Sequence, residues 1–550
     1  MHAKLSKVSF NFMIVQFVIA LFARTTLYPP FTYSIFKHTK PIIEPTEVMK
    51  RIIALSLLML SISYYSHSDD HKETPAKPIP EPQVVETQHK GKFFGENVKY
   101  KVVTGDTHLK DKDGHPMASI FSTTYIKEGV KNKDERPVIF VFNGGPGSSS
   151  VWLHLGVFGP KVVELPSDAG AVGSPPYKLK DNPFSLLDIA DMVFMDPVGT
   201  GYSTALGKYK GKDFWGVKED AEVLSEFIRL FITRYERWNS PKYLAGESYG
   251  TTRAGAMVKE LQEGWGSIDL AGVFLISSII DFQTGDFTDG NDIPFMTFLP
   301  TYAATAWYHK ALPEQAKWSS LESFLNEVRE FALNDYVTFL FKGSLASEQQ
   351  TSNVLEKLHA YTGLSRTFIK NSNYRINEFH FMKELLRDRA QVVGRLDSRY
   401  LGKERNNVEV RFEADPSGYA IDGAYTAAMQ TYLARDLDVK RDEKYNILSG
   451  EVFVNWNWLY GNSARSQGFI NVTPFLATAQ NQNKDFRIFV ANGYYDLATP
   501  FFATEHSMNH HGIDLDRVTM KYYEAGHMMY IHHPSLEQLA KDMREFILQQ

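Results

Sequence analysis

The sequence contains no cysteine. A disulfide framework, a thiolate metal site and a cysteine nucleophile are therefore excluded, whereas export is not, because packing alone can stabilise an exported protein. The sequence also lacks an excess of positive charge, since its formal net charge is −5. A nucleic-acid partner is accordingly not expected. The chain does have 550 residues with 43% hydrophobic content, which is enough for one large core or two smaller ones.

The N-terminal part of the chain has the pattern of an exported protein. Residues 49–68 (MKRIIALSLLMLSISYYSHS) have a basic start, an apolar centre and small residues near the end, which is typical of a secretory signal peptide. The apolar centre is too short to span a bilayer comfortably, so no stable membrane anchor is expected after cleavage. We expect residues 1–68 to be an extension and signal peptide with the true start at Met49, followed by a disordered linker at 69–90. The product is expected to be periplasmic or secreted.

Strands and helices alternate over most of the remaining chain. Apolar runs such as RPVIFVFNG and LAGVFLISSIID indicate strands buried on both faces, and an amphipathic helical pattern separates them. This alternation predicts an α/β fold with a mostly parallel central sheet and helices on both faces. Aromatic-rich helical segments interrupt it at residues 292–443, where we expect a helical cap inserted between two core parts, 91–291 and 444–550.

The segment GESYG at residues 246–250 matches the pattern G-x-S-x-G. It lies between a short apolar run and a helical pattern. At a strand-to-helix turn, these residues hold the serine in a strained conformation with its hydroxyl exposed for nucleophilic attack. An ordinary structural turn is the alternative interpretation. Ser248 is therefore the candidate nucleophile.

A serine nucleophile needs a base, and the base needs an acid to orient it. In a sheet of this type the acid and then the histidine follow the serine in sequence, on loops at the carboxyl ends of strands. Asp496 follows the strand-like run FRIFVANG, and His527 follows RVTMKYYEAG. Asp485 precedes its strand and belongs to the opposite end. Ser248, Asp496 and His527 are therefore predicted to form a catalytic triad.

Three other histidines have a spacing that suits metal binding. They are His506, His510 and His511, which lie in or near a predicted helix. No nearby acidic cluster completes a metal site, so a solvated helix end is the preferred interpretation. Neither a metal nor a cofactor is expected.

The glycine-rich segment NGGPGSSS at residues 143–150 directly follows a predicted buried strand. It contains no lysine and lacks the phosphate-loop pattern, and the strand before it argues against a flexible linker. An acyl-transfer serine needs backbone donors for the oxyanion that forms on the attacked carbonyl. We expect these donors to be the N–H groups of Gly144 and Tyr249. Gly145 has no side chain, and we expect this to leave room for the substrate to approach.

Five segments together resemble the serine carboxypeptidases, a family of α/β-hydrolases. They are NGGPGSSS, NPFSLLDIADMVFMDPVGTGYS, GESYG, NGYYDLATP and AGHMM, which occur in the family's order between about Gly91 and Gln550. The resemblance implies an α/β-hydrolase fold with a helical cap. It also implies hydrolysis of the C-terminal residue of peptides or proteins through an acyl-enzyme on Ser248.

The resemblance further implies that Asn143 and Glu247 bind the terminal carboxylate of the substrate. A protonated Glu247 can donate a hydrogen bond to that carboxylate, as the Asn143 amide can, so activity is expected to favour acidic pH. The alternative for Glu247 is an acid that is stabilised by the positive end of the following helix.

The sequence departs from the family's pattern at two informative positions. Ser148 stands where family members often have cysteine, and Val157 stands where many relatives have a second glutamate, which affects the expected carboxylate site. Two other functions remain open. One is a serine esterase or acyltransferase with the same triad, and the other is a catalytically inactive binding protein with this fold.

Overall fold

The computed structural model describes residues 79–264, 266–410, 412–460 and 468–549. The predicted signal peptide and the first part of the predicted linker lie outside these residues. Ala76–Gln550 form one compact unit. In the part of the chain that is described, no helix has the length and apolarity needed to cross a membrane.

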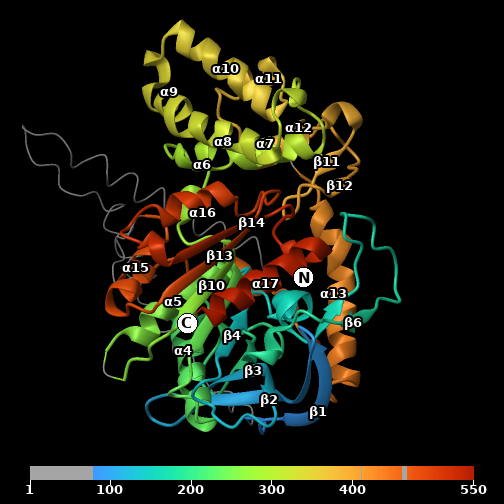
Figure 1. Ribbon diagram of the computed structural model, residues 1–550, viewed down its shortest axis with the longest axis vertical. Coiled ribbons are helices and arrows are strands. Elements are labelled where there is room, and N and C mark those ends of the chain that lie inside the picture. Colours follow the sequence, from blue (N-terminus) through green and yellow to red (C-terminus); the bar gives the residue numbers. More distant parts are fainter. Residues whose placement is uncertain (1–78, 265, 411, 461–467, 550) are drawn as a thin grey trace, which may run out of the picture. The chain divides into compact units, whose positions relative to one another are not determined.

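The centre of the unit is a 10-stranded sheet with the order β1-β2-β3-β7-β4-β9-β10-β13-β14, and β8 pairs with β3 (Figure 1). The strands are β1 (Val84–Phe93), β2 (Glu96–Lys110), β3 (Pro116–Lys127), β4 (Val138–Phe142), β7 (Asp191–Met195), β8 (Thr204–Ala205), β9 (Lys242–Ser248), β10 (Gly272–Ser278), β13 (Arg487–Gly493) and β14 (Val518–Tyr523). All neighbours from β7 to β14 are parallel, and β1 to β3 form an antiparallel edge. The predicted mostly parallel sheet is confirmed.

Helices cover both faces of this sheet. Alternate residues of β4 belong to different hydrophobic clusters: Ile139 and Val141 pack on one face, and Phe140 and Phe142 on the other. The helices of the two faces are α4 (Val217–Arg234), α5 (Tyr249–Gln262) and α15 (Thr473–Gln482) on the Phe140 side, and α13 (Pro416–Arg435) and α17 (His533–Leu548) on the Ile139 side. Because every residue of β4 is buried, its near-continuous apolar sequence is explained.

Residues 84–90, which the sequence analysis assigns to a linker, form the start of β1 instead. The whole of β1 pairs antiparallel with β2, from Val84 opposite Gly105 to Phe93 opposite Glu96. Exposed and partly buried residues alternate along β1 until Phe93, which is buried. An edge strand with one face towards solvent needs few apolar residues, so its polar composition suggested a linker.

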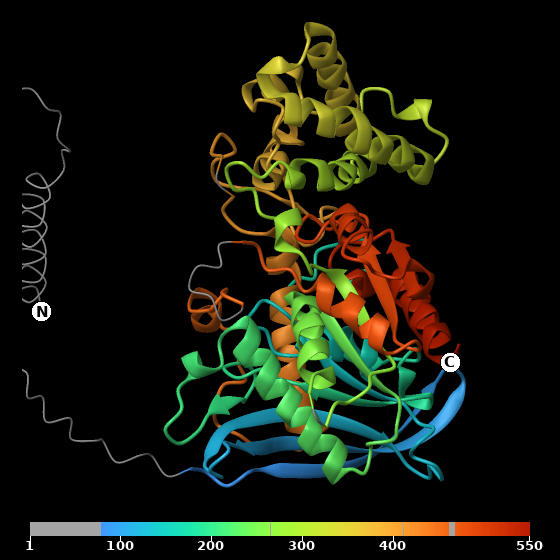
Figure 2. The ribbon, with the colours of Figure 1, turned by 90° about the vertical axis from the view of Figure 1, so that its left-hand side faces the viewer.

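The insertion between β10 and β13 is mainly helical. Its α-helices in the described residues are α6 (Ile293–Thr297), α7 (Leu299–Tyr308), α8 (Leu321–Phe331), α9 (Val337–Lys342), α10 (Glu348–Thr362), α11 (Arg366–Asn371), α12 (Glu378–Glu384), α13, α14 (Gly450–Val454) and α15, with the short strands β11 (Val392–Val393) and β12 (Leu401–Gly402). Figures 1 and 2 show α7 to α12, drawn in yellow-green to gold, gathered beyond β13 and β14. A third hydrophobic cluster fills this group and extends to Tyr495 and Leu497, which flank Asp496. The remaining short elements are α3 (Val151–Leu153), β5 (Lys161–Val163), β6 (Leu179–Asp181) and α16 (Phe501–Met508).

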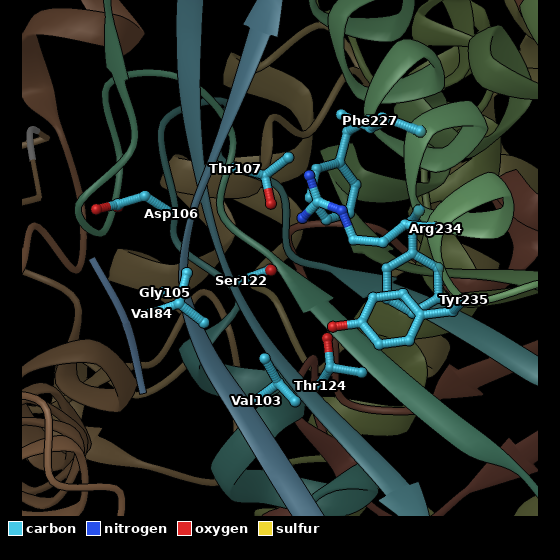
Figure 3. A pocket seen from close by; sticks show the side chains of 12 residues that line it. Val84, Val103, Gly105, Asp106, Thr107, Ser122, Thr124, Phe227, Arg234 and Tyr235 are labelled. Atoms are coloured by element: carbon cyan, nitrogen blue, oxygen red, sulfur yellow. The ribbon is translucent and has the colours of Figure 1, made fainter. Parts of the chain in front are cut away.

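A small cavity of about 40 Å³ lies between the antiparallel edge and α4 (Figure 3). Figure 3 shows Tyr235, at the end of α4, with its hydroxyl directed towards Thr124 of β3. The volume has room for only a few water molecules. None of the predicted site residues lines this cavity, so it is not the predicted catalytic site.

Candidate active site

Ser248 lies at the junction of a strand and a helix. β9 ends at Ser248 and α5 begins at Tyr249, so the predicted strand-to-helix turn is present. Ser248 has a φ of 60° and a ψ of −131°, a strained combination for a residue with a side chain. A Cβ on Gly246 would lie 2.2 Å from the carbonyl oxygen of Gly250, so the turn requires glycine there. This is the geometry of a nucleophile elbow.

His527 and Asp496 are paired in the interior. His527 Nδ1 and Asp496 Oδ2 are 2.7 Å apart, and the Asp496 side chain is fully buried. Asp496 also accepts hydrogen bonds from the N–H groups of Ala498 and Thr499, at 2.8 and 3.0 Å, and from the Thr499 hydroxyl at 2.6 Å. The carboxylate is thus fixed, and its bond to Nδ1–H leaves Nε2 of His527 able to accept a proton.

Burial and the Asp496 carboxylate have opposite effects on the pKa of His527. Burial lowers the pKa of His527, but the charge of Asp496 and its hydrogen bond raise this pKa more, and the net shift is upward. A neighbouring carboxylate therefore makes the imidazole a stronger base, as a triad requires.

The loop that carries His527 is attached to the strand beside the elbow. The Ser277 hydroxyl donates to the carbonyl oxygen of His527 at 2.5 Å, and Ser278 is the register partner of Ser248 between β10 and β9. The three predicted triad residues therefore lie at the same end of neighbouring parallel strands. The described residues offer the Ser248 hydroxyl no hydrogen-bond partner. Catalytic hydrogen bonds are often long before substrate binds.

The glycine-rich loop packs directly against the elbow. A Cβ on Gly144 would lie 2.5 Å from the Tyr249 nitrogen and 2.6 Å from the Gly250 nitrogen, so only glycine fits. Tyr249 is the first residue of α5, and its N–H therefore has no partner within the helix. Gly145 is the exposed glycine of the loop and has a φ of 104°. The predicted donors are thus adjacent to Ser248, with the N–H of Gly145 as a further candidate.

Two buried charged residues fix the position of the glycine-rich loop through hydrogen bonds. Arg253 of α5 is fully buried, donates to the carbonyl oxygen of Asn143, and pairs with Asp220 at 2.5 Å. Asp196 accepts hydrogen bonds from the backbone N–H and the hydroxyl of Ser150, both at 2.9 Å. The sequence analysis missed both residues. Their positions in the sequence could have indicated them, because Arg253 closely follows GESYG and Asp196 lies within MDPVGTGYS.

Asn143 and Glu247 meet in a buried network beside Ser248. Asn143 Nδ2 donates to Glu247 Oε2, and the Asn143 Oδ1 atom accepts the N–H of Leu153 at 3.1 Å, which fixes the orientation of the amide. The Tyr530 hydroxyl reaches both oxygens of Glu247, at 2.9 and 3.0 Å. Glu247 is only 2% exposed, and burial raises its pKa to about 7. The carboxyl group is therefore largely protonated under mildly acidic conditions.

The sequence analysis did not predict Tyr530. Its ring lies against Gly156, where a Cβ would be 2.2 Å from a ring carbon. Val157 is 1% exposed and follows Gly156 in a π-helical turn, His154–Phe158. A phenol hydroxyl thus contacts Glu247, and its ring occupies the space beside Gly156. Nothing in the sequence around Tyr530 revealed this contact, because it depends on the missing side chain of Gly156.

Residues 395–399, here called the strap, run between β11 and β12 and contact the loops that carry Asp496 and His527. The strap is joined to the loops of Asp496 and His527 by four hydrogen bonds that involve backbone N–H groups, and by a fifth from Arg399 Nη1 to Glu524 O at 3.3 Å. The four run from Leu497 N to Arg395 O at 3.0 Å, from His527 N to Leu396 O at 2.6 Å, from Ser398 N to Tyr495 O at 2.9 Å, and from Gly526 N to Asp397 Oδ2 at 3.2 Å. The helical insertion is therefore bonded directly to the acid and base loops.

Comparison with known families agrees with this geometry. The family model described as serine carboxypeptidase, Peptidase S10, matches residues 118–540. The chain belongs to the serine carboxypeptidase family. Among curated members, "Serine carboxypeptidase-like 13" of Arabidopsis thaliana is 28% identical over 29% of this chain and 36% of its own length. "Serine carboxypeptidase-like 5" of the same plant is 30% identical over 26% and 31%. The chain thus spans about a third of these relatives.

A solved carboxypeptidase structure confirms the fold. Kex1Δp, a prohormone-processing carboxypeptidase from Saccharomyces cerevisiae, is 16% identical and covers 82% of this chain and 91% of its own, with a TM-score of 0.50. The predicted α/β-hydrolase fold is therefore confirmed for this member of the family. The roles of its individual residues are argued from its own geometry.

Proposed function

We propose that the protein is a serine carboxypeptidase that hydrolyses the C-terminal residue of peptides or proteins through an acyl-enzyme on Ser248. The observation that carries this proposal is the buried pair of Asn143 and Glu247 beside the elbow. Hydrolysis of a simple ester requires no group that recognises a terminal carboxylate. A buried amide and a carboxyl with a raised pKa are two neutral donors that suit a substrate's terminal carboxylate.

The proposed reaction follows from the positions of the triad. His527 Nε2 takes the proton of the Ser248 hydroxyl while the oxygen attacks the scissile carbonyl carbon. Asp496 stabilises the imidazolium that forms. The N–H groups of Tyr249 and of Gly144 or Gly145 donate to the oxyanion. His527 then protonates the leaving amine, the C–N bond breaks, and an acyl-enzyme remains on Ser248.

Water completes the cycle by the same route. His527 removes a proton from water as the water oxygen attacks the acyl carbon. The C–O bond to Ser248 then breaks, and the serine recovers its proton from the imidazolium. The released products are an amino acid and a peptide shortened by one residue.

The proposal includes a preference for acidic pH. A terminal carboxylate is repelled by an ionised Glu247 and is bound by a protonated one. The pKa of Glu247 is raised by burial to about 7, so the binding form is lost as the pH rises through neutrality. Activity in strongly acidic solution is limited in turn, because His527 must be neutral to act as the base.

A comparison of three substrates tests the proposed function. The substrates are a blocked dipeptide with a free C-terminus, its C-terminal amide, and a simple ester. We expect kcat/KM for the free acid to exceed that for the amide by roughly a hundredfold, because the amide places no charge beside Asn143 and Glu247. Hydrolysis of the ester without cleavage of the free acid would establish the esterase alternative. Acyl transfer to an added alcohol in preference to water would establish the acyltransferase.

Export is the other part of the proposal, and residues 49–68 support it. Their basic start, apolar centre and small residues at the end match a secretory signal peptide. N-terminal sequencing of the exported protein tests this assignment. A mature N-terminus shortly after Ser68 is expected, whereas a mature N-terminus near residue 1 would refute it.

A further inference from the structure

Arg395 lies at the start of the strap, with its backbone fixed beside the catalytic loops. Its carbonyl oxygen accepts the N–H of Leu497 at 3.0 Å, and its own N–H donates to Asp415 at 3.0 Å. The next carbonyl, that of Leu396, accepts the N–H of His527 at 2.6 Å. The backbone of Arg395 and of the residue after it is therefore bonded to the loops of Asp496 and His527.

The guanidinium of Arg395 has no anionic partner in the described part of the chain. Its side chain forms no hydrogen bond or ion pair with those residues, and its Nε atom is buried without a partner. The guanidinium carbon lies 6.0 Å from the centre of the Phe379 ring. Arginine stays protonated in proteins, so this is a permanent, partly desolvated positive charge. Arg395 is only partly buried, and its two terminal nitrogens, which form no hydrogen bond with the described residues, are free to bind an anion.

Glu378 is a buried acid within the electrostatic influence of Arg395, but it does not form an ion pair with it. Glu378 is 6% exposed, and one of its carboxyl oxygens is buried without a hydrogen-bond partner. Burial raises the pKa of Glu378 to about 7, while the charge of Arg395 lowers it. Below neutral pH the carboxyl is therefore largely protonated and does not neutralise the guanidinium.

The unpaired charge also acts on the catalytic base. Among the smaller effects on His527, the Arg395 charge lowers the pKa of the imidazole. The backbone of Arg395 and that of Leu396 contact the loops of Asp496 and His527 directly. A ligand for Arg395 is therefore expected to lie close to the scissile bond.

We propose that Arg395 binds a carboxylate side chain of the peptide substrate, so that the enzyme prefers Asp or Glu on one side of the scissile bond. This inference rests on the proposed carboxypeptidase function. The planar guanidinium matches a carboxylate with two parallel hydrogen bonds. It differs in kind from the pair Asn143 and Glu247, which offers neutral donors to the terminal carboxylate.

Two pairs of blocked dipeptides test the inference at a pH of about 6, where side-chain carboxylates are ionised. Phe-Glu and Phe-Gln differ in the released residue, and Glu-Phe and Gln-Phe differ in the residue before the scissile bond. In the wild type, we expect kcat/KM for the Glu member of one pair to exceed that for its Gln partner by roughly ten- to a hundredfold. The pair that shows the preference identifies the side of the bond that Arg395 contacts.

Variants of Arg395 separate recognition from folding. R395Q is expected to reduce the Glu:Gln ratio to about one, and R395K is expected to retain part of it, because lysine keeps the charge but loses the planar fork. R375Q is the matched control, since Arg375 is a cap arginine already paired with Asp292 at 2.7 Å. It is expected to keep the wild-type ratio. Fluorophosphonate labelling of Ser248 verifies that each variant is folded and assembled.

Each alternative outcome has a distinct meaning. Equal rates for Glu and Gln members in the wild type overturn the inference while leaving the carboxypeptidase function intact. An equal loss for all four dipeptides in R395Q also overturns it, because Arg395 then contacts the terminal carboxylate or the backbone. Failure of the wild type to cleave any of the four, with normal labelling of Ser248, contradicts the proposed function itself.

Discussion

Asn143 and Glu247 are hydrogen-bonded to each other although they are 104 residues apart in the sequence. The parallel pairing of β4 with β9 brings them together, since Asn143 follows the end of β4 and Glu247 is the penultimate residue of β9. The same pairing places the glycine-rich loop against the elbow. One strand contact therefore positions both the expected oxyanion donors and the expected carboxylate site.

Ser248→Ala and His527→Ala are each expected to remove most turnover without unfolding the protein. Triad residues share one chemical step, so the double variant is expected to be little worse than either single variant. Steady-state rates measure the losses, and thermal unfolding verifies the fold. Losses that multiply in the double variant would show that the two residues act in separate steps.

Asp496→Asn is expected to reduce kcat by roughly 10³- to 10⁴-fold. The amide can bond to the other tautomer of His527 and does not stabilise the imidazolium. Asp485→Asn is the control, because Asp485 precedes β13 and lies at its opposite end. Rates on the same peptide compare the two variants. A near-normal rate for Asp496→Asn points to a different orienting acid.

Gly144→Ala tests the contact between the glycine loop and the elbow. Its Cβ would lie 2.5 Å from the Tyr249 nitrogen, so the loop or the elbow must shift. We expect kcat to fall by about 10²- to 10³-fold through misplaced oxyanion donors. Gly450→Ala is the control, since a Cβ there meets no atom within 4 Å. Comparable kinetics for the two variants would show that Gly144 does not position the oxyanion donors.

Tyr530→Phe tests the contact that the sequence did not reveal. The hydroxyl of Tyr530 stabilises the ionised form of Glu247, so its removal raises the pKa of Glu247 further. Cleavage of free-acid peptides is then expected to persist to higher pH, by about one pH unit. Tyr523→Phe is the control, because Tyr523 donates to Asp542 in the same way at 2.8 Å. The pH profile of kcat/KM gives the result, and an unchanged profile removes Tyr530 from the site.

The sequence was sufficient for those parts of the site that lie at strand ends. Ser248 ends β9, Asp496 follows β13 and His527 follows β14, and parallel strands present their carboxyl ends at one edge of a sheet. The burial of both faces of the sheet was also predictable, because buried strands such as β4 have almost no polar residues.

Parts of the fold that depend on distant packing were not predictable. The contact of Tyr530 with Glu247 requires the space above Gly156, and the strap reaches His527 through backbone atoms, which leave no sequence signal. Arg395 lies in an unremarkable segment between two short strands. Strand β1 was assigned to a linker because only one of its faces is buried.

The pH dependence of kcat/KM, measured for a free-acid peptide and for a neutral ester, tests the central claim most directly. As the pH rises above about 7, ionisation of Glu247 is expected to lower the value for the peptide by up to tenfold per pH unit. The value for the ester is expected to rise or stay level, since His527 loses its proton. Glu247→Gln keeps a donor that cannot ionise and should make the two profiles alike. Wild-type profiles that coincide would contradict recognition of a terminal carboxylate by Glu247.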